Sequence, residues 1–103
     1  MDGGTTWQNF NSGGISADTA VENISVNTNT TYTFTKDGCF WFLGTTSGRY
    51  DITIDRANYE DVTIESFAGA DYTLRPINAG DTFRASWKTG TQSAFTLYLY
   101  PLS

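Results

Sequence analysis

The chain has 103 residues, a length that suits one domain with a single hydrophobic core. Aromatic residues make up 16% of the chain and charged residues 17%, a composition typical of a globular protein and not of a disordered one. The formal net charge is −5 and the six Lys and Arg residues are scattered singly. Nucleic-acid binding needs a clustered basic face, so we expect no nucleic-acid partner.

The absence of histidine and the single cysteine exclude several kinds of site. Cys39 alone cannot form an internal disulfide or a cysteine-based zinc cage, and no Ser-His-Asp or Cys-His arrangement is possible. Because it lies in an apolar run, Cys39 is predicted to be a small buried hydrophobic residue. No stretch approaches the length of a membrane span, and no basic start with an apolar run indicates a signal peptide. We expect no metal, no cofactor and no membrane insertion.

The chain divides into a short first part and one predicted domain. Residues 1–16 are rich in Gly, Asn and Ser, with Trp7 and Phe10 as their large apolar residues. This part is interpreted as a linker or a loose first strand, and residues 17–103 as the domain.

Strands are predicted almost throughout the domain, because apolar and polar residues alternate with a period of two. In chain order the predicted strands are ENISV (22–26), TYTFT (31–35), CFWFL (39–43), YDITID (50–55), EDVTIE (60–65), DYTLR (71–75), TFRASWK (82–88) and FTLYLY (95–100). The residues predicted to share the core-facing side of their strands are Tyr32, Phe34, Tyr50, Ile52, Ile54, Val62, Ile64, Tyr72, Leu74, Phe83, Ala85, Trp87, Phe95, Leu97 and Leu99. About eight strands at this spacing predict an all-β fold, an antiparallel β-sandwich or jelly-roll-like domain.

Turn residues separate these strands. Asp37-Gly38 is the favoured pair for a tight hairpin turn, and Gly48, Gly69, Gly80 and Gly90 mark further turns. A short loop at 56–58 is predicted to join the strands on either side of it.

The predicted strands at 39–43 and 95–100 are apolar on both faces, although a strand with one solvated face should alternate. The predicted outward residues are Phe40, Phe42, Tyr98 and Tyr100. Together they would expose a few hundred Å² of contiguous apolar surface, which usually marks an interface. Trp7 and Phe10 could cover this surface as a lid, or a ligand could occupy it. We favour self-association, in which further copies of the chain cover it with closed symmetry.

Candidate chemistry is sparse. The carboxylates Asp51, Asp55, Glu60, Asp61 and Glu65 cluster in one predicted hairpin, as a glycosidase would require, but alternation indicates that they belong to a solvated outer face. The chain is therefore predicted not to be an enzyme.

Aromatic side chains leave a binding role open. Tyr59 is out of phase with Val62 and Ile64, which turns it outward, and Trp7 is not tied to a strand pattern. These two are the candidate ligand-facing aromatics. Trp41 and Trp87 are in phase with apolar neighbours and are predicted to lie in the core.

Four ordered segments resemble a known family. NTTYTFTKDGCFWFLG, YDITIDRANYEDVTIES, LRPINAGDTFRAS and the terminal FTLYLYPLS resemble the small β-sandwich knob domains of bacteriophage tail, collar or head fibres. The shared features fall at Asp37-Gly38, at 52–55, at 77–81 and at Tyr100-Pro101, and the resemblance covers residues 20–103. The segment DRANYE departs from the tight Asn-Gly turn that is frequent in the family.

The resemblance implies a non-enzymatic virion or prophage structural domain. It implies a homotrimeric knob at the virion surface that serves in host-surface attachment or virion decoration, with host-surface glycans or proteins as possible partners. No catalytic residues are carried over. The alternative is a monomeric bacterial carbohydrate-binding or adhesion module, which would be extracellular and would need an exposed aromatic platform.

Overall fold

The computed structural model describes residues 21–102, which form eight β-strands arranged in two four-stranded sheets. The strands are β1 (Glu22–Val26), β2 (Thr31–Thr33), β3 (Gly38–Leu43), β4 (Gly48–Asp55), β5 (Val62–Phe67), β6 (Ala70–Ile77), β7 (Thr82–Gly90) and β8 (Phe95–Pro101). The predicted all-β sandwich is confirmed, and the strand predicted at 22–26 is β1. Residues 1–16, interpreted above as a linker or loose first strand, lie outside the described residues.

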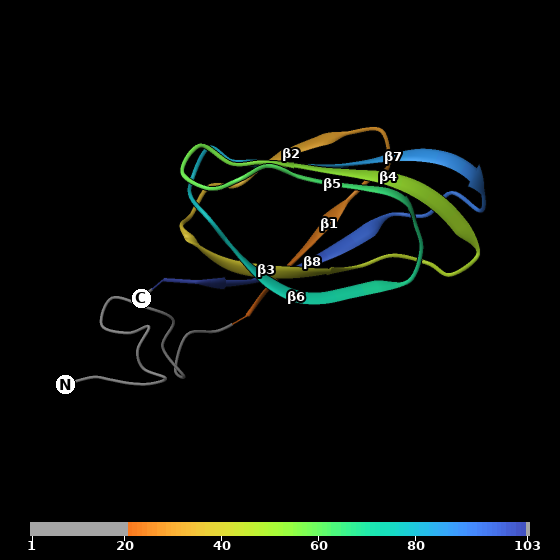
Figure 1. Cartoon of the computed structure of the whole chain (residues 1–103). Coiled ribbons are helices and arrows are strands. Elements are labelled where there is room, and N and C mark those ends of the chain that lie inside the picture. The colour runs from red at the N-terminus through yellow and green to blue at the C-terminus, as the bar shows by residue number, and fades with distance from the viewer. Residues whose placement is uncertain (1–20, 103) are drawn as a thin grey trace.

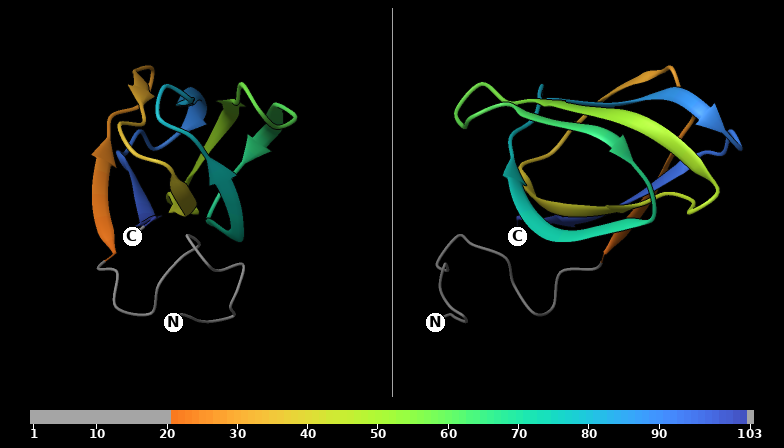
Figure 2. Two further views of the ribbon diagram at one scale, coloured as in Figure 1. Left: turned by 90° about the vertical axis from the view of Figure 1, so that its left-hand side faces the viewer. Right: turned by 45° about the vertical axis from the view of Figure 1, so that its right-hand side comes forward.

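The order of the strands gives the fold its topology. One sheet has the order β1-β8-β3-β6 and the other β2-β7-β4-β5, and every neighbouring pair is antiparallel. The first strand thus pairs with the last, the second with the seventh, the third with the sixth and the fourth with the fifth. A single long hairpin rolled into two layers has this order, which is the jelly roll. Figure 1 shows the two layers, and the right-hand view of Figure 2 shows the same separation.

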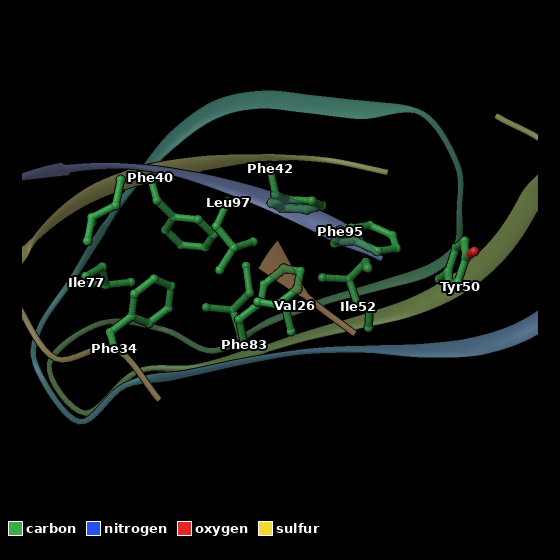
Figure 3. Close-up of a cluster of buried hydrophobic side chains, with 13 residues drawn as sticks. Val26, Phe34, Phe40, Phe42, Tyr50, Ile52, Ile77, Phe83, Phe95 and Leu97 are labelled. Carbon is green, nitrogen blue, oxygen red and sulfur yellow. The ribbon is translucent and has the colours of Figure 1, made fainter. Parts of the chain in front are cut away.

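The core fills the space between the two sheets. The side chains that form it are Val26, Phe34, Phe40, Phe42, Tyr50, Ile52, Ile54, Ile77, Phe83, Ala85, Phe95, Leu97 and Leu99. Their rings are in mutual contact: Phe83 meets Phe40 edge-on with centroids 6.1 Å apart, and Phe95 meets Tyr50 edge-on at 4.8 Å. Each buried side chain of this size contributes about 1.5–3 kcal/mol to folding. The close-up in Figure 3 shows these side chains converging from both layers.

The turn predictions are partly confirmed. Gly80 has a φ of 98°, and Gly69 and Gly90 also have positive φ, as expected of turn glycines. The hairpin predicted at Asp37-Gly38 is wrong, because β2 and β3 lie in different sheets and the chain crosses between layers there. Glycine is required at position 38 for another reason. A Cβ atom at Gly38 would lie 2.3 Å from the carbonyl oxygen of Tyr100 on the neighbouring strand.

The predicted core positions of Trp87, Tyr72 and Leu74 are also wrong. Trp87 follows the inward-facing Ala85 by two residues, yet it is exposed and its Nε1 donates to the Gly90 carbonyl at 3.1 Å. The strand β2 pairs with β7 only at residues 82–84, so Trp87 lies on the part of β7 that extends beyond its short neighbour. Tyr72 and Leu74 are exposed because they lie on the side of β6 that faces away from the core, opposite to Asp71 and Arg75.

Candidate functional site

Among residues 21–102, no charged side chain lies on the outer side of the strands of the sheet β1-β8-β3-β6. Successive strand residues point to opposite faces, and those opposite the core define what we call the aromatic face. Its residues are Asn23, Ser25, Cys39, Trp41, Leu43, Ala70, Tyr72, Leu74, Pro76, Thr96, Tyr98 and Tyr100. Apolar and aromatic side chains occupy its centre, and uncharged polar ones occupy β1 at its edge.

The outer side of the other sheet is different. Its outward positions include the charged residues Arg49, Asp51, Asp55, Glu65, Arg84 and Lys88. Asp51 and Lys88 form an ion pair across neighbouring strands at 3.5 Å. The chain therefore has one charged sheet face and one uncharged aromatic sheet face. Depletion of charge together with enrichment in Tyr and Trp is the composition of the central part of a protein interface.

Phe40 and Phe42 do not belong to the aromatic face, which corrects the outward orientation predicted for them. Both are 0% exposed and point into the core (Figure 3). The register explains why: Phe42 lies opposite Leu97 on β8, and cross-strand neighbours share a face. Trp41, which was predicted to be in the core, takes the outward position instead. An interface formed by Phe40 and Phe42 would require the core to open.

Trp41 lies at the centre of a row of stacked rings. Its ring lies 4.2 Å from that of Tyr98 with 17° between the planes, and 5.0 Å from that of Tyr72 with 38° between the planes. Because β3 lies between β8 and β6, the two tyrosines contact opposite sides of the indole. Tyr98 stacks on the indole, whereas Tyr72 is tilted against it and is largely exposed. We call Tyr72, Trp41 and Tyr98 the ring row.

Tyr100 completes the polar contacts of the ring row. The Nε1 atom of Trp41 donates a hydrogen bond to the hydroxyl of Tyr100 at 3.3 Å. The predicted alternation of β8 is confirmed, since Leu97 and Leu99 are buried and Tyr98 and Tyr100 are partly exposed on the opposite side. Indole and phenol groups are thus held in place within one chain.

The strand β6 carries an irregularity that shapes the aromatic face. Phe40 pairs with Arg75 and Phe42 with Asp71, so a step of two residues in β3 corresponds to a step of four in β6. The extra residues form a β-bulge at 72–74. Tyr72 is 73% exposed and Leu74 45% exposed. The predicted inward orientation of these residues is wrong because Asp71, Arg75 and Ile77, which pair with Phe42, Phe40 and Gly38, take the core-facing side of β6. The strand still alternates, but its apolar side faces away from the core.

An ion pair closes the base of this bulge on the core side. Arg75 and Asp71 lie 3.1 Å apart, and the Asp71 carboxylate also accepts a hydrogen bond from the Thr73 backbone amide at 3.0 Å. Burial acts to raise the pKa of Asp71. The hydrogen bonds from Thr73 and Arg75 and the charge of Arg75 outweigh it and hold the pKa below its ordinary value of 3.8. The guanidinium of Arg75 also lies over the ring of Phe42, 5.9 Å from its centroid.

Tyr59, a predicted ligand-facing aromatic, lies on the loop between β4 and β5, two strands of the other sheet. Its outward orientation is confirmed by an exposed fraction of 45%. The guanidinium of Arg56 lies over its ring at 5.2 Å and donates two hydrogen bonds to the Glu60 carbonyl. Trp7, the other candidate, lies outside the described residues.

The acidic residues and the cysteine have structural surroundings. Asp51 accepts a hydrogen bond from the Ser66 amide, and Asp61 accepts one from the Arg56 amide. Within residues 21–102 no group of three or more Cys, Asp or Glu side chains is placed to hold a metal ion. Cys39 is buried, as predicted, and burial raises the pKa of its thiol.

Comparisons with known proteins found no matching family model, no matching curated protein and no matching solved structure. Over the described part of the chain, no helix is long and apolar enough to span a membrane.

Proposed function

We propose that this chain is a non-enzymatic structural module of a bacteriophage fibre, assembled as a homotrimer, that serves in host-surface attachment or virion decoration at the virion surface. The observation that carries the proposal is the aromatic face, which is free of charge in a chain whose net charge is −5. The ordered turn and strand motifs that resemble fibre knobs support the class of protein.

Self-association suits an uncharged face for an electrostatic reason. Side chains close to a rotation axis meet the same side chains of the neighbouring copies, so a charge there would meet its own like charge. Copies that each carry −5 also repel one another at long range. A face without charged residues is the surface at which that repulsion is smallest.

The ring row has the properties of a pre-organised contact surface. Trp41 is held between Tyr98 and Tyr72 and is hydrogen-bonded to Tyr100, so little side-chain freedom remains to be lost when a partner covers it. Tyr and Trp are also the residue types that most often carry binding energy at protein interfaces.

The alternative of a monomeric carbohydrate-binding module is less well supported. A sugar ring stacks on the open face of an aromatic side chain, but both sides of Trp41 are already in contact with tyrosines. The exposed Tyr59 has the guanidinium of Arg56 over its ring. An adhesion role through the ring row stays open as the second candidate.

Light scattering on the purified full chain tests the proposal. The expected mass is three times 11.4 kDa, and Tyr98→Glu is expected to reduce it to that of one chain by placing a charge within the aromatic face. Thr63→Glu, on the outer side of β5, adds the same charge to the opposite sheet and should leave the mass unchanged. A monomeric wild-type chain would overturn the homotrimer.

A further inference from the structure

We propose that Tyr72 and Leu74, held outward on the clamped bulge of β6, are the anchor residues through which the aromatic face binds a second copy of this chain. This inference rests on the self-association proposed above and names the residues that decide its strength. It is carried by the irregular pairing of β6, by the Asp71–Arg75 ion pair and by the exposure of the two side chains.

The bulge determines how a partner can approach this edge of the sheet. β6 is an edge strand, because it stands last in the order β1-β8-β3-β6. A flat edge would accept another strand, whereas bulges, prolines and inward-pointing charges prevent that pairing. β6 combines all of these features in the bulge at 72–74, in Pro76 and in the core-side pair of Asp71 and Arg75. A partner must therefore dock on side chains and not on the backbone of this strand.

The Asp71–Arg75 ion pair makes the bulge a rigid support. In a regular strand, residues four apart are separated by about 13 Å, too far for this pair to form easily. Here the two side chains meet at 3.1 Å, and the Asp71 carboxylate also fixes the Thr73 amide. The segment between them is consequently tied at its base, and Tyr72 and Leu74 project from a fixed position.

Tyr72 is the most exposed of the large apolar side chains in the described chain and is nevertheless ordered by contact with Trp41. A protruding aromatic residue that is held before binding costs little entropy when it is buried, which is the property of an interface hot spot. Leu74 lies two residues further on the same strand and adds an aliphatic surface next to the ring row. Together they extend the aromatic face to its β6 edge.

A second copy is the occupant that the charges favour. A basic partner would be recognised by acidic side chains and an acidic partner by basic ones. Among the described residues of the aromatic face there are neither acidic nor basic side chains. The identical face of another copy meets these requirements because it is equally uncharged and equally rich in aromatic rings.

Sedimentation equilibrium on the full chain and on three variants tests this inference. Tyr72→Ala and Leu74→Ser should each weaken self-association at least about tenfold, as expected for hot-spot truncation. The matched control is Tyr59→Ala, which removes a tyrosine of 45% exposure from the loop between β4 and β5 and should leave the association constant unchanged. Far-ultraviolet circular dichroism should be the same for all four proteins, because the three substituted side chains are exposed.

The outcomes separate this inference from the proposed function. If the wild type assembles and neither Tyr72→Ala nor Leu74→Ser weakens it, the anchors are wrong and self-association stands. If Tyr59→Ala weakens assembly as much as Tyr72→Ala, the anchors are likewise wrong. A wild-type monomer overturns both proposals. In that case two further results would identify what covers the aromatic face. Binding of a soluble polysaccharide to the wild type but not to Tyr72→Ala would show that the face binds a saccharide. Assembly of Trp7→Ala, where the wild type stays monomeric, would show that the chain's own first residues cover the face.

Discussion

Trp41 on β3 and Tyr98 on β8 occupy directly opposed register positions, and their rings stack with centroids 4.2 Å apart. This pair lies on the side of its sheet that faces away from the core, where an isolated domain would be expected to display polar residues. Stacking fixes both rings within one chain and leaves the rest of their surface on the side of the sheet away from the core. The proposed self-association through the aromatic face depends on this arrangement.

Truncation of Phe42 tests its inward orientation. Phe42→Ala should lower the free energy of unfolding by about 3–5 kcal/mol, because a fully buried ring is replaced by a cavity. Urea denaturation at a fixed protein concentration measures this, with Tyr59→Ala as the exposed control, expected within about 1 kcal/mol of wild type. Equal effects of the two substitutions would mean that Phe42 does not lie in the core.

Loss of the Asp81 carboxylate should destabilise the end of the sandwich where two loops meet. Asp81 is buried and accepts hydrogen bonds from the backbone amides of Ala57 at 3.1 Å and Asn78 at 2.8 Å. Asp81→Ala leaves both donors without an acceptor and should cost about 2–4 kcal/mol. Asp81→Asn retains one acceptor oxygen, so its cost in the same urea titration should be smaller. An alanine variant as stable as wild type would contradict this role.

The lowered pKa of Asp71 predicts a pH-dependent contribution to stability. Because the folded-state pKa lies below its ordinary value of 3.8, the fold favours the ionised carboxylate. The resulting stabilisation is present above the unfolded-state pKa and is lost as the pH falls through the folded-state pKa. Wild type should therefore be more stable than Asp71→Asn near neutral pH, and the difference should shrink as the solution is acidified below pH 3.8. Urea titrations across this range measure it, and a difference that grows on acidification would refute the ion pair.

A methyl group at position 38 should not be tolerated. In Gly38→Ala the new Cβ would lie 2.3 Å from the Tyr100 carbonyl oxygen and 2.9 Å from the Pro101 Cα. Both are backbone atoms of the paired strand and cannot rotate away, so strands β3 and β8 must separate locally. We expect a loss of about 1–3 kcal/mol or more in thermal or urea unfolding. A variant with unchanged stability would show that the two strands are not this close.

Much of the fold could be predicted from alternation, because alternation reports which face of a strand is buried. Tyr50, Ile52 and Ile54 are all buried as predicted, and so are Leu97 and Leu99 on β8. Two turn glycines that need positive φ, Gly69 and Gly80, were also recognisable from the sequence. These predictions succeed because each depends on local chemistry within one strand or one turn.

Of the four residues predicted to face outward, Tyr98 and Tyr100 do so, whereas Phe40 and Phe42 lie in the core. The run from Cys39 to Leu43 is apolar throughout, so it has no phase of its own, and the orientation of Phe42 follows only from its pairing with Leu97. In β6 the alternation is real but its apolar side faces outward, because Asp71 and Arg75 pair with the inward Phe42 and Phe40 and form an ion pair there. The core position predicted for Trp87 was wrong for a related reason, since the exposure of its side chain depends on the short length of the neighbouring strand β2.

Fluorescence quenching of Trp41 tests most directly whether other copies cover the aromatic face. In a chain carrying Trp7→Phe and Trp87→Phe, Trp41 is the remaining tryptophan, since the sequence has three. Quenching by iodide should be greater at protein concentrations where the chain is monomeric and should decrease as the concentration rises through the assembly transition. Quenching that stays constant while the mass increases would place the contact elsewhere and contradict the role proposed for this face.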